Sequence, residues 1–145
     1  MNYIGKWIFH SIGVVNDNDE LVYLDAQGYL DSPMCYIDET DSEAVEDEMK
    51  ERRQLVNGQL SICEDGKMYM LLPFPESVSQ AEIDEAVAAG EIKIYDGMMT
   101  QDPFDWEERN GELWVNMNMG DDGFIRLSDD NGFITVMTTR YTKAD

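Results

Sequence analysis

The chain has 145 residues, 43% of them apolar, and a formal net charge of -21 at pH 7. This length corresponds to about one domain, so we expect residues 1–145 to fold as a single unit around one apolar core. With 10 basic against 31 acidic residues, no basic surface remains for a phosphate backbone or an anionic membrane leaflet, so neither nucleic acid nor a membrane is an expected partner.

The N-terminus has no basic segment followed by the apolar run of a signal peptide, and no stretch approaches the roughly 20 apolar residues of a membrane span. We therefore expect a cytoplasmic protein. Two cysteines, Cys35 and Cys63, lack the spacing of a redox or metal motif. They are expected to be reduced, buried thiols.

The first half of the chain predicts two antiparallel hairpins with a helix between them. Residues 3–15 and 21–24 form the first pair, joined through residues 16–19. The helix is expected from Ser42 to Leu55, with Thr40 and Glu43 spaced as a capping box. Because its apolar stripe is thin, this helix should rest outside a barrel or across its mouth. Residues 60–63 and 68–72 form the second hairpin, whose Asp-Gly pair at 65–66 supplies the positive φ angles of a tight turn.

The second half continues in the same manner. A helix is predicted from Gln80 to Ala89, because Ser79 and Glu82 form a capping box and Gly90 follows its end. A short strand over 92–95 precedes a hairpin over 105–115 that turns at Asn110-Gly111. The turn at 129–132 joins a strand over 124–127 to a final strand over 133–141. The total of about eight to ten strands is the number at which antiparallel sheets close into barrels.

The two ends of the chain carry a family resemblance. Gly5-Lys6-Trp7 heads the first strand, and Arg140 lies on the last. This pairing resembles the lipocalin-like (calycin-type) small β-barrels, where the Trp closes the narrow end and a basic residue packs over it. The resemblance implies a bacterial lipocalin-like family, a mainly β, antiparallel barrel with two short helices outside or at the mouth, and Trp7 with Arg140 as its structural plug. Arg140-Tyr141 also resembles the close of fatty-acid-binding proteins, but adjacent residues face opposite ways on a strand, so that site is not carried over.

Four residues are candidates for the wall of a ligand cavity. Phe9 should point inward with Trp7, because side chains alternate along a strand. Met70 comes from the hairpin over 60–72, and methionine adapts to varied apolar partners. Trp114 and Asn116 alternate with Leu113, Val115 and Met117, so they either line the cavity or, if the apolar set faces inward, leave Trp114 exposed as a partner contact.

Metal and catalytic sites are not expected. The acidic loops do not fit the spaced calcium loop of an EF-hand and are interpreted as a solvated rim, and His10 has no second metal ligand nearby in the sequence. No nucleophile and base combination is recognisable, so we expect neither a cofactor nor an enzyme. The sequence thus favours a non-catalytic binding protein for a small apolar or amphipathic ligand. The alternative is an acidic protein-protein interaction module with no small ligand.

Overall fold

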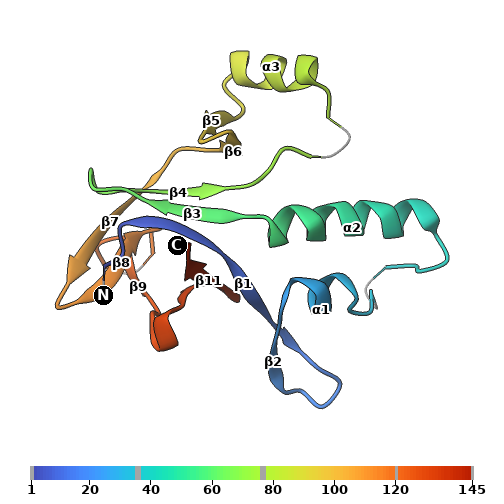
Figure 1. Ribbon diagram of the computed structural model, residues 1–145, viewed down its shortest axis with the longest axis horizontal. Coiled ribbons are helices and arrows are strands. Elements are labelled where there is room, and N and C mark those ends of the chain that lie inside the picture. The colour runs from blue at the N-terminus through green and yellow to red at the C-terminus, as the bar shows by residue number, and fades with distance from the viewer. Residues whose placement is uncertain (1, 35–36, 76–77, 120, 145) are drawn as a thin grey trace.

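The computed structural model describes residues 2–34, 37–75, 78–119 and 121–144. Eight antiparallel strands follow one another around a nearly closed barrel in the order β10-β11-β1-β3-β4-β7-β8-β9 (Figure 1). Their bounds are β1 Gly5–Val15, β3 Gln59–Ile62, β4 Lys67–Leu71, β7 Phe104–Arg109, β8 Glu112–Asn116, β9 Phe124–Leu127, β10 Ile134–Val136 and β11 Thr139–Lys143. A single bridge between Ser128 and Thr135 joins the two ends of this path. The prediction of a mainly β, antiparallel barrel is confirmed.

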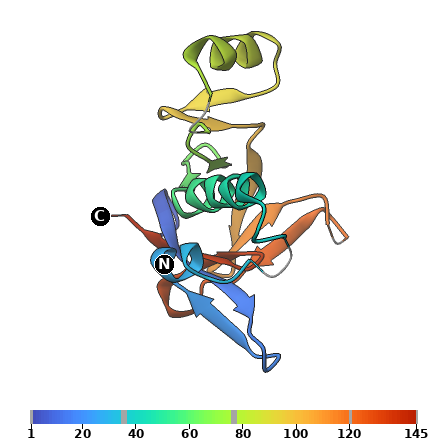
Figure 2. The same cartoon turned by 90° about the vertical axis from the view of Figure 1, so that its right-hand side faces the viewer.

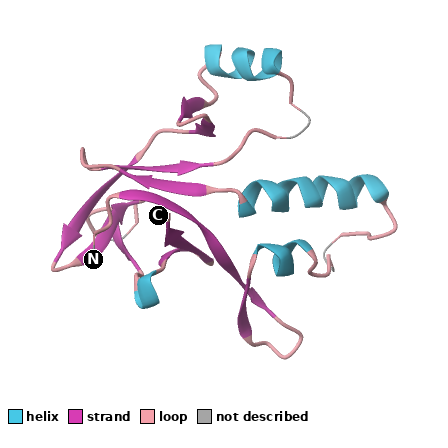
Figure 3. Cartoon of the chain, viewed as in Figure 1, coloured by secondary structure: helices cyan, strands magenta, loops and turns pink. Residues whose placement is uncertain are grey.

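The remaining elements lie outside the barrel (Figures 2 and 3). Strand β2 (Leu21–Leu24) pairs with the far half of β1, and β5 (Lys93–Tyr95) pairs with β6 (Met98–Thr100). The helices are α1 (Ala26–Leu30), α2 (Ser42–Val56) and α3 (Gln80–Ala88), with a 3-10 turn η1 over Asp130–Gly132. Figure 1 shows α3 and the β5–β6 hairpin on one side of the barrel, with the β1–β2 hairpin on the opposite side.

The predicted hairpin turns are confirmed where Gly follows Asp or Asn. Gly66 has φ 83° in the β3–β4 turn, and Asn110 and Gly111 have φ 53° and 79° in the β7–β8 turn. The helix prediction needs one correction at the first cap. Asp41, not Thr40, caps α2, because its carboxylate accepts the backbone N–H groups of Glu43 and Ala44. At α3, the predicted cap is confirmed: the Ser79 hydroxyl oxygen accepts the N–H of Glu82 at 3.2 Å.

Three features depart from the predicted elements. The final strand over 133–141 is wrong as one piece, because Met137 takes φ 57° and turns the chain back from β10 into β11. The short strand over 92–95 is half of a hairpin, since Asp96 and Gly97 turn the chain into β6. Helix α1 was not predicted, and its cap is Asp25, whose carboxylate accepts the N–H of Gly28 at 2.7 Å.

Apolar side chains fill the interior of the barrel. Leu60, Met68, Leu113, Val115 and Ile134 come from five different strands and are each 0% exposed. A cavity large enough for water would expose the side chains that face it. The barrel therefore has a packed core around these residues, as small eight-stranded barrels can have.

The base of the barrel is closed by Trp7 and Tyr3, which are both buried. The Trp7 indole Nε1–H donates to the carbonyl oxygen of Tyr3 at 2.8 Å. The Tyr3 hydroxyl lies 2.6 Å from Oδ2 of Asp129 and 2.8 Å from the carbonyl oxygen of Gly111. Trp7 thus fixes the N-terminal segment, and Tyr3 ties that segment to the β7–β8 turn and to the loop after β9.

Arg140 is not part of this plug, so the predicted Trp7–Arg140 pair is wrong. Cross-strand neighbours share a face, and the register pairs Trp7 with Lys143, whose Nζ lies 5.9 Å from the Trp7 ring centroid. Arg140 is three positions away and belongs to the opposite face. A bulge between Phe9 and Ser11 moves the register, so that Arg140 pairs with Ser11. The cation at the plug is Lys143.

A buried arginine anchors the two helices beside the barrel. Arg52, on α2, is 2% exposed, and its Nε donates to Glu48 Oε1 at 3.1 Å. Its Nη1 donates to the carbonyl oxygens of Tyr29 and Ser32, each at 2.8 Å. Arg52 therefore ties the end of α1 and the segment that follows it to α2.

We predict that Arg52→Met costs about 3 to 5 kcal/mol of stability, because it leaves buried carbonyl groups and a carboxylate without their cation. The control is Arg53→Met, next in the chain, where a partly exposed pair with Glu46 predicts a loss of about 1 kcal/mol or less. Urea unfolding at neutral pH measures both values. Equal losses in the two variants would contradict the anchoring role of Arg52.

We also predict that stability falls as the pH rises above about 10, where tyrosines of the unfolded chain ionise. Burial and the hydrogen bond to Asp129 raise the pKa of Tyr3, so the folded state keeps a proton that the unfolded state has lost. Stability then decreases with pH, because the unfolded state binds fewer protons. Tyr3→Phe should make this decrease shallower in urea melts from about pH 9 to 11, and an unchanged slope would contradict the assignment. Burial raises the pKa of Tyr141 as well, so part of the slope remains.

Candidate functional site

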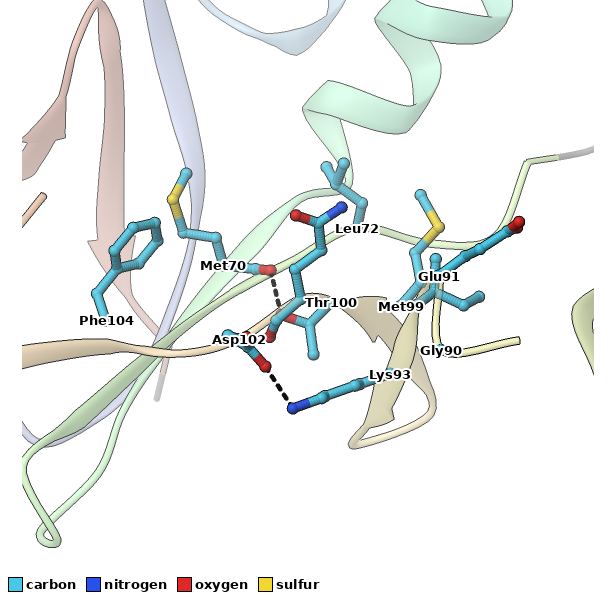
Figure 4. Close-up of a pocket in the computed structure, with 11 residues that line it drawn as sticks. Met70, Leu72, Gly90, Glu91, Lys93, Met99, Thr100, Asp102 and Phe104 are labelled. Atoms are coloured by element: carbon cyan, nitrogen blue, oxygen red, sulfur yellow. Dashed lines mark hydrogen bonds and ion pairs between the residues drawn. The ribbon is translucent and has the colours of Figure 1, made fainter. Parts of the chain in front are cut away.

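A groove of about 610 Å³ lies outside the barrel, between β4, the β5–β6 hairpin and the turn that follows α3 (Figure 4). Its apolar walls come from different elements: Met70 and Leu72 at the end of β4, Ile92 before β5, Met99 on β6 and Phe104 at the start of β7. Phe104 also packs against the barrel core. The groove is therefore built on one side from the barrel and on the other from the hairpin.

Hydrogen bonds fix the hairpin against β4. The backbones of Leu72 and Met99 exchange two hydrogen bonds, of 3.0 and 2.9 Å. The buried Thr100 hydroxyl donates to the carbonyl oxygen of Met70 at 2.8 Å, as Figure 4 shows. These bonds hold Met70 and Met99 on opposite sides of the groove, which is thus formed by ordered backbone on both sides.

Charged side chains lie at one end of the groove. Lys93 and Asp102 form an ion pair between β5 and the segment after β6 (Figure 4). The hydrogen bond from Lys93 lowers the pKa of the Asp102 carboxyl, and the same bond raises the pKa of Lys93. Both side chains are well exposed, so the pair adds little stability. Glu91 and Gln101 are the other polar side chains of the lining.

Of the predicted wall residues, only Met70 lies in this groove. Met68 and Met70 alternate with Tyr69 and share one strand face. Met68 is buried in the core, whereas Met70 lies near the strand end, beyond the core, and is 36% exposed. Phe9 is half-buried on β1, opposite Tyr141, and lines neither this groove nor the smaller pocket described below.

Trp114 and Asn116 lie on the outer face of β8, because Leu113 and Val115 are the residues that enter the core. Of the two predicted alternatives for this strand, the one that places Trp114 and Asn116 inside a cavity is therefore wrong. Trp114 is not fully exposed, since the guanidinium of Arg109 stacks 4.9 Å from its ring centroid. Met70 and Trp114 consequently do not share a cavity wall.

Sequence reasoning missed Leu72, Met99 and Phe104 as wall residues. A signal was present, because Asp96-Gly97 is a tight-turn pair between the predicted strand over 92–95 and the adjacent methionines at 98 and 99. It indicates a hairpin, and hence a second set of apolar side chains beside β4. The backbone bridge from Met99 to Leu72 has no comparable signal.

A second pocket of about 220 Å³ lies where the end of α2 meets residues 73–75, between Lys50, Arg53 and Phe74. Among the described residues, no group of three or more His, Cys, Asp or Glu side chains is placed to hold a metal ion. No helix in the described ranges is long and apolar enough to cross a membrane. Cys35 lies outside the described residues, and Cys63 is a free, half-buried thiol.

Comparison with known proteins identifies no relative. No family model matches the chain, no curated protein matches it, and no solved structure matches it. The class of protein is therefore defined by the fold alone, as a nearly closed antiparallel β-barrel compatible with a lipocalin-like architecture.

Proposed function

We propose that this protein is a non-catalytic binding protein, lipocalin-like in architecture, which holds a small apolar or amphipathic molecule in the outer groove. The observation that carries the proposal is the groove itself. Its volume of about 610 Å³ falls within the range of small-molecule sites, about 300 to 1,000 Å³. Its walls are mostly apolar, with a few polar groups among them, which is the usual composition of such sites.

The side chains of the groove favour a ligand that is apolar along most of its length. Met70 and Met99 face the groove from its two sides, and methionine side chains adapt to ligands of different shapes. Leu72 and Phe104 extend the same surface. A single polar group on the ligand would find the Lys93–Asp102 pair at the end of the groove. An amphipathic molecule therefore fits better than a purely polar metabolite.

The packing of the barrel supports a site outside it. A lipocalin-like barrel holds its ligand in the interior only where the core leaves room. Here Leu60, Met68 and Leu113 are 0% exposed, so ligand entry among them would require displacement of close-packed side chains. The groove takes a ligand without that cost.

The groove presents no activated hydroxyl nucleophile. A hydroxyl or thiol acts as a nucleophile when a base lies within hydrogen-bond reach. The lining contains one hydroxyl, that of Thr100, and this group is buried and donates to a backbone carbonyl.

The test is a thermal-shift screen with fatty acids, retinoid-like compounds and aromatic metabolites, followed by calorimetry on any ligand that stabilises the protein. A ligand at a hundred times its dissociation constant should stabilise the fold by about 2.7 kcal/mol. Met70→Gln keeps the length of the side chain but replaces its apolar end with an amide. We predict that it weakens binding by about tenfold, the cost of placing an unsatisfied polar group against an apolar ligand.

The control is Met119→Gln, because Met119 is an exposed methionine away from the groove. It should leave the dissociation constant unchanged. A panel without any stabilising ligand, or a ligand that binds equally well to wild type and Met70→Gln, would contradict the proposed site.

A further inference from the structure

A second feature lies on the opposite side of the molecule, on the outer face of β1, β2 and β11. The guanidinium of Arg140 stacks on the ring of Tyr23, with Cζ 3.4 Å from the ring centroid, and lies 5.6 Å from that of Phe133. His10 extends the stack, its ring centroid 4.2 Å from that of Phe133. Three aromatic rings and one guanidinium thus form a continuous ladder across three strands and the start of β10.

Arg140 differs from the other arginines in having no acceptor. Arg52, Arg53, Arg109 and Arg126 each form an ion pair with a carboxylate. Arg140 makes no ion pair and no hydrogen bond within the described residues, in a chain with 31 acidic side chains. Arg109 is the useful comparison, because it also stacks between two rings but is paired with both Glu107 and Asp122.

Exposed apolar side chains surround Arg140. Val15 and Leu21 pair across the β1–β2 hairpin and are 66% and 58% exposed. At Gly13 the β1–β2 hairpin packs closely enough that a side chain would meet Leu21 and Tyr23. The backbone N–H of Gly13 donates to the carbonyl oxygen of Thr138 at 2.7 Å. That bond brings the β10–β11 turn, with the fully exposed Met137, beside the hairpin. We call this surface, made of Val15, Leu21, Tyr23, Phe133, Met137 and Arg140, the Arg140 face.

We propose that the Arg140 face docks a protein segment that presents one Asp or Glu carboxylate between apolar residues, with basic residues on either side. Tyr23 and Phe133 contact the guanidinium through their rings, and its N–H groups have no acceptor among the described residues, so they are left for an acceptor on a partner. A carboxylate can accept two of them in parallel, which is the strongest geometry for an arginine. The apolar neighbours of the carboxylate would cover Val15 and Leu21, and arginine among aromatic side chains is typical of the centre of such interfaces.

The basic residues of the proposed partner segment are inferred from the negative charge around the Arg140 face. The turn between β1 and β2 carries Asp17, Asp19 and Glu20, all exposed, and the chain as a whole has a net charge of -21. An acidic partner would be repelled before its carboxylate reached Arg140. A segment with a net positive charge and one central carboxylate complements both the acidic turn between β1 and β2 and the guanidinium of Arg140.

The experiment uses two acetylated and amidated peptides, Lys-Leu-Glu-Leu-Lys and its Gln counterpart, titrated into the full-length ¹⁵N-labelled protein. Chemical shifts report both the dissociation constant and the location. We expect the Glu peptide to bind about tenfold more tightly than the Gln peptide, as a charge-assisted hydrogen bond predicts. The shifts should centre on the backbone signals of Leu21, Tyr23 and Arg140.

Arg140→Gln should abolish the preference for the Glu peptide, whereas Arg109→Gln, at the other stacked arginine, should retain it. The double variant Val15→Ser with Leu21→Ser provides a second test, because it should weaken both peptides while the preference persists. The spectra show at the same time that each variant is folded.

Three results would overturn the proposal: equal affinity of wild type for the two peptides, including no binding of either; shifts that centre on another face; or a preference that survives Arg140→Gln. A dilution series of the protein alone tests a second copy of the chain as the occupant. If concentration-dependent shifts map to the Arg140 face, the face is a self-association surface, and the proposed partner is wrong.

Discussion

The hydrogen bond from the Trp7 indole to the carbonyl oxygen of Tyr3 is the contact on which the rest of the barrel depends. It holds the segment before β1 under the barrel, and from there the Tyr3 hydroxyl reaches the β7–β8 turn and the loop after β9. The contacts of the Tyr3 hydroxyl span more than a hundred residues of sequence, and they tie the segment before β1 directly to the β7–β8 turn and to the loop after β9. Because Tyr3 and Trp7 are buried, removal of either would leave both a cavity and unpaired polar groups.

Closing the barrel in this way has a consequence for function. The small interior is filled by side chains, so the ligand site that we propose lies elsewhere. The proposed groove is built by an insertion between β4 and β7, whose hairpin is bonded to the end of β4 through Leu72 and Met99. The β1–β2 hairpin extends from the opposite side (Figure 1) and carries the Arg140 face. The barrel thus supports two separate surfaces, the groove that we propose for a small apolar molecule and the Arg140 face that we propose for a peptide.

Local signals predicted much of the fold. Asp-Gly at 65–66 and Asn-Gly at 110–111 determine their turns, and the Ser79 cap determines the start of α3. Non-local effects account for the errors. Met137 adopts a positive φ without the Gly or Asn that normally indicates one. The register of β11 on β1 places Lys143, not Arg140, opposite Trp7, and no local signal in either strand indicates that register. Met70 was correctly placed on its strand, but its groove depends on a pairing between Leu72 and Met99 that neither segment indicates by itself.

The central claim is that ligand binds outside a packed barrel, and the methionines allow a direct test. In protein labelled with ¹³C at the methionine methyl groups, a stabilising ligand should shift the signals of Met70 and Met99, which line the groove. The signal of Met68, which is 0% exposed in the core, should stay in place. A ligand that shifts Met68 and leaves Met70 and Met99 unchanged would show that the interior opens to bind it, and would contradict this account.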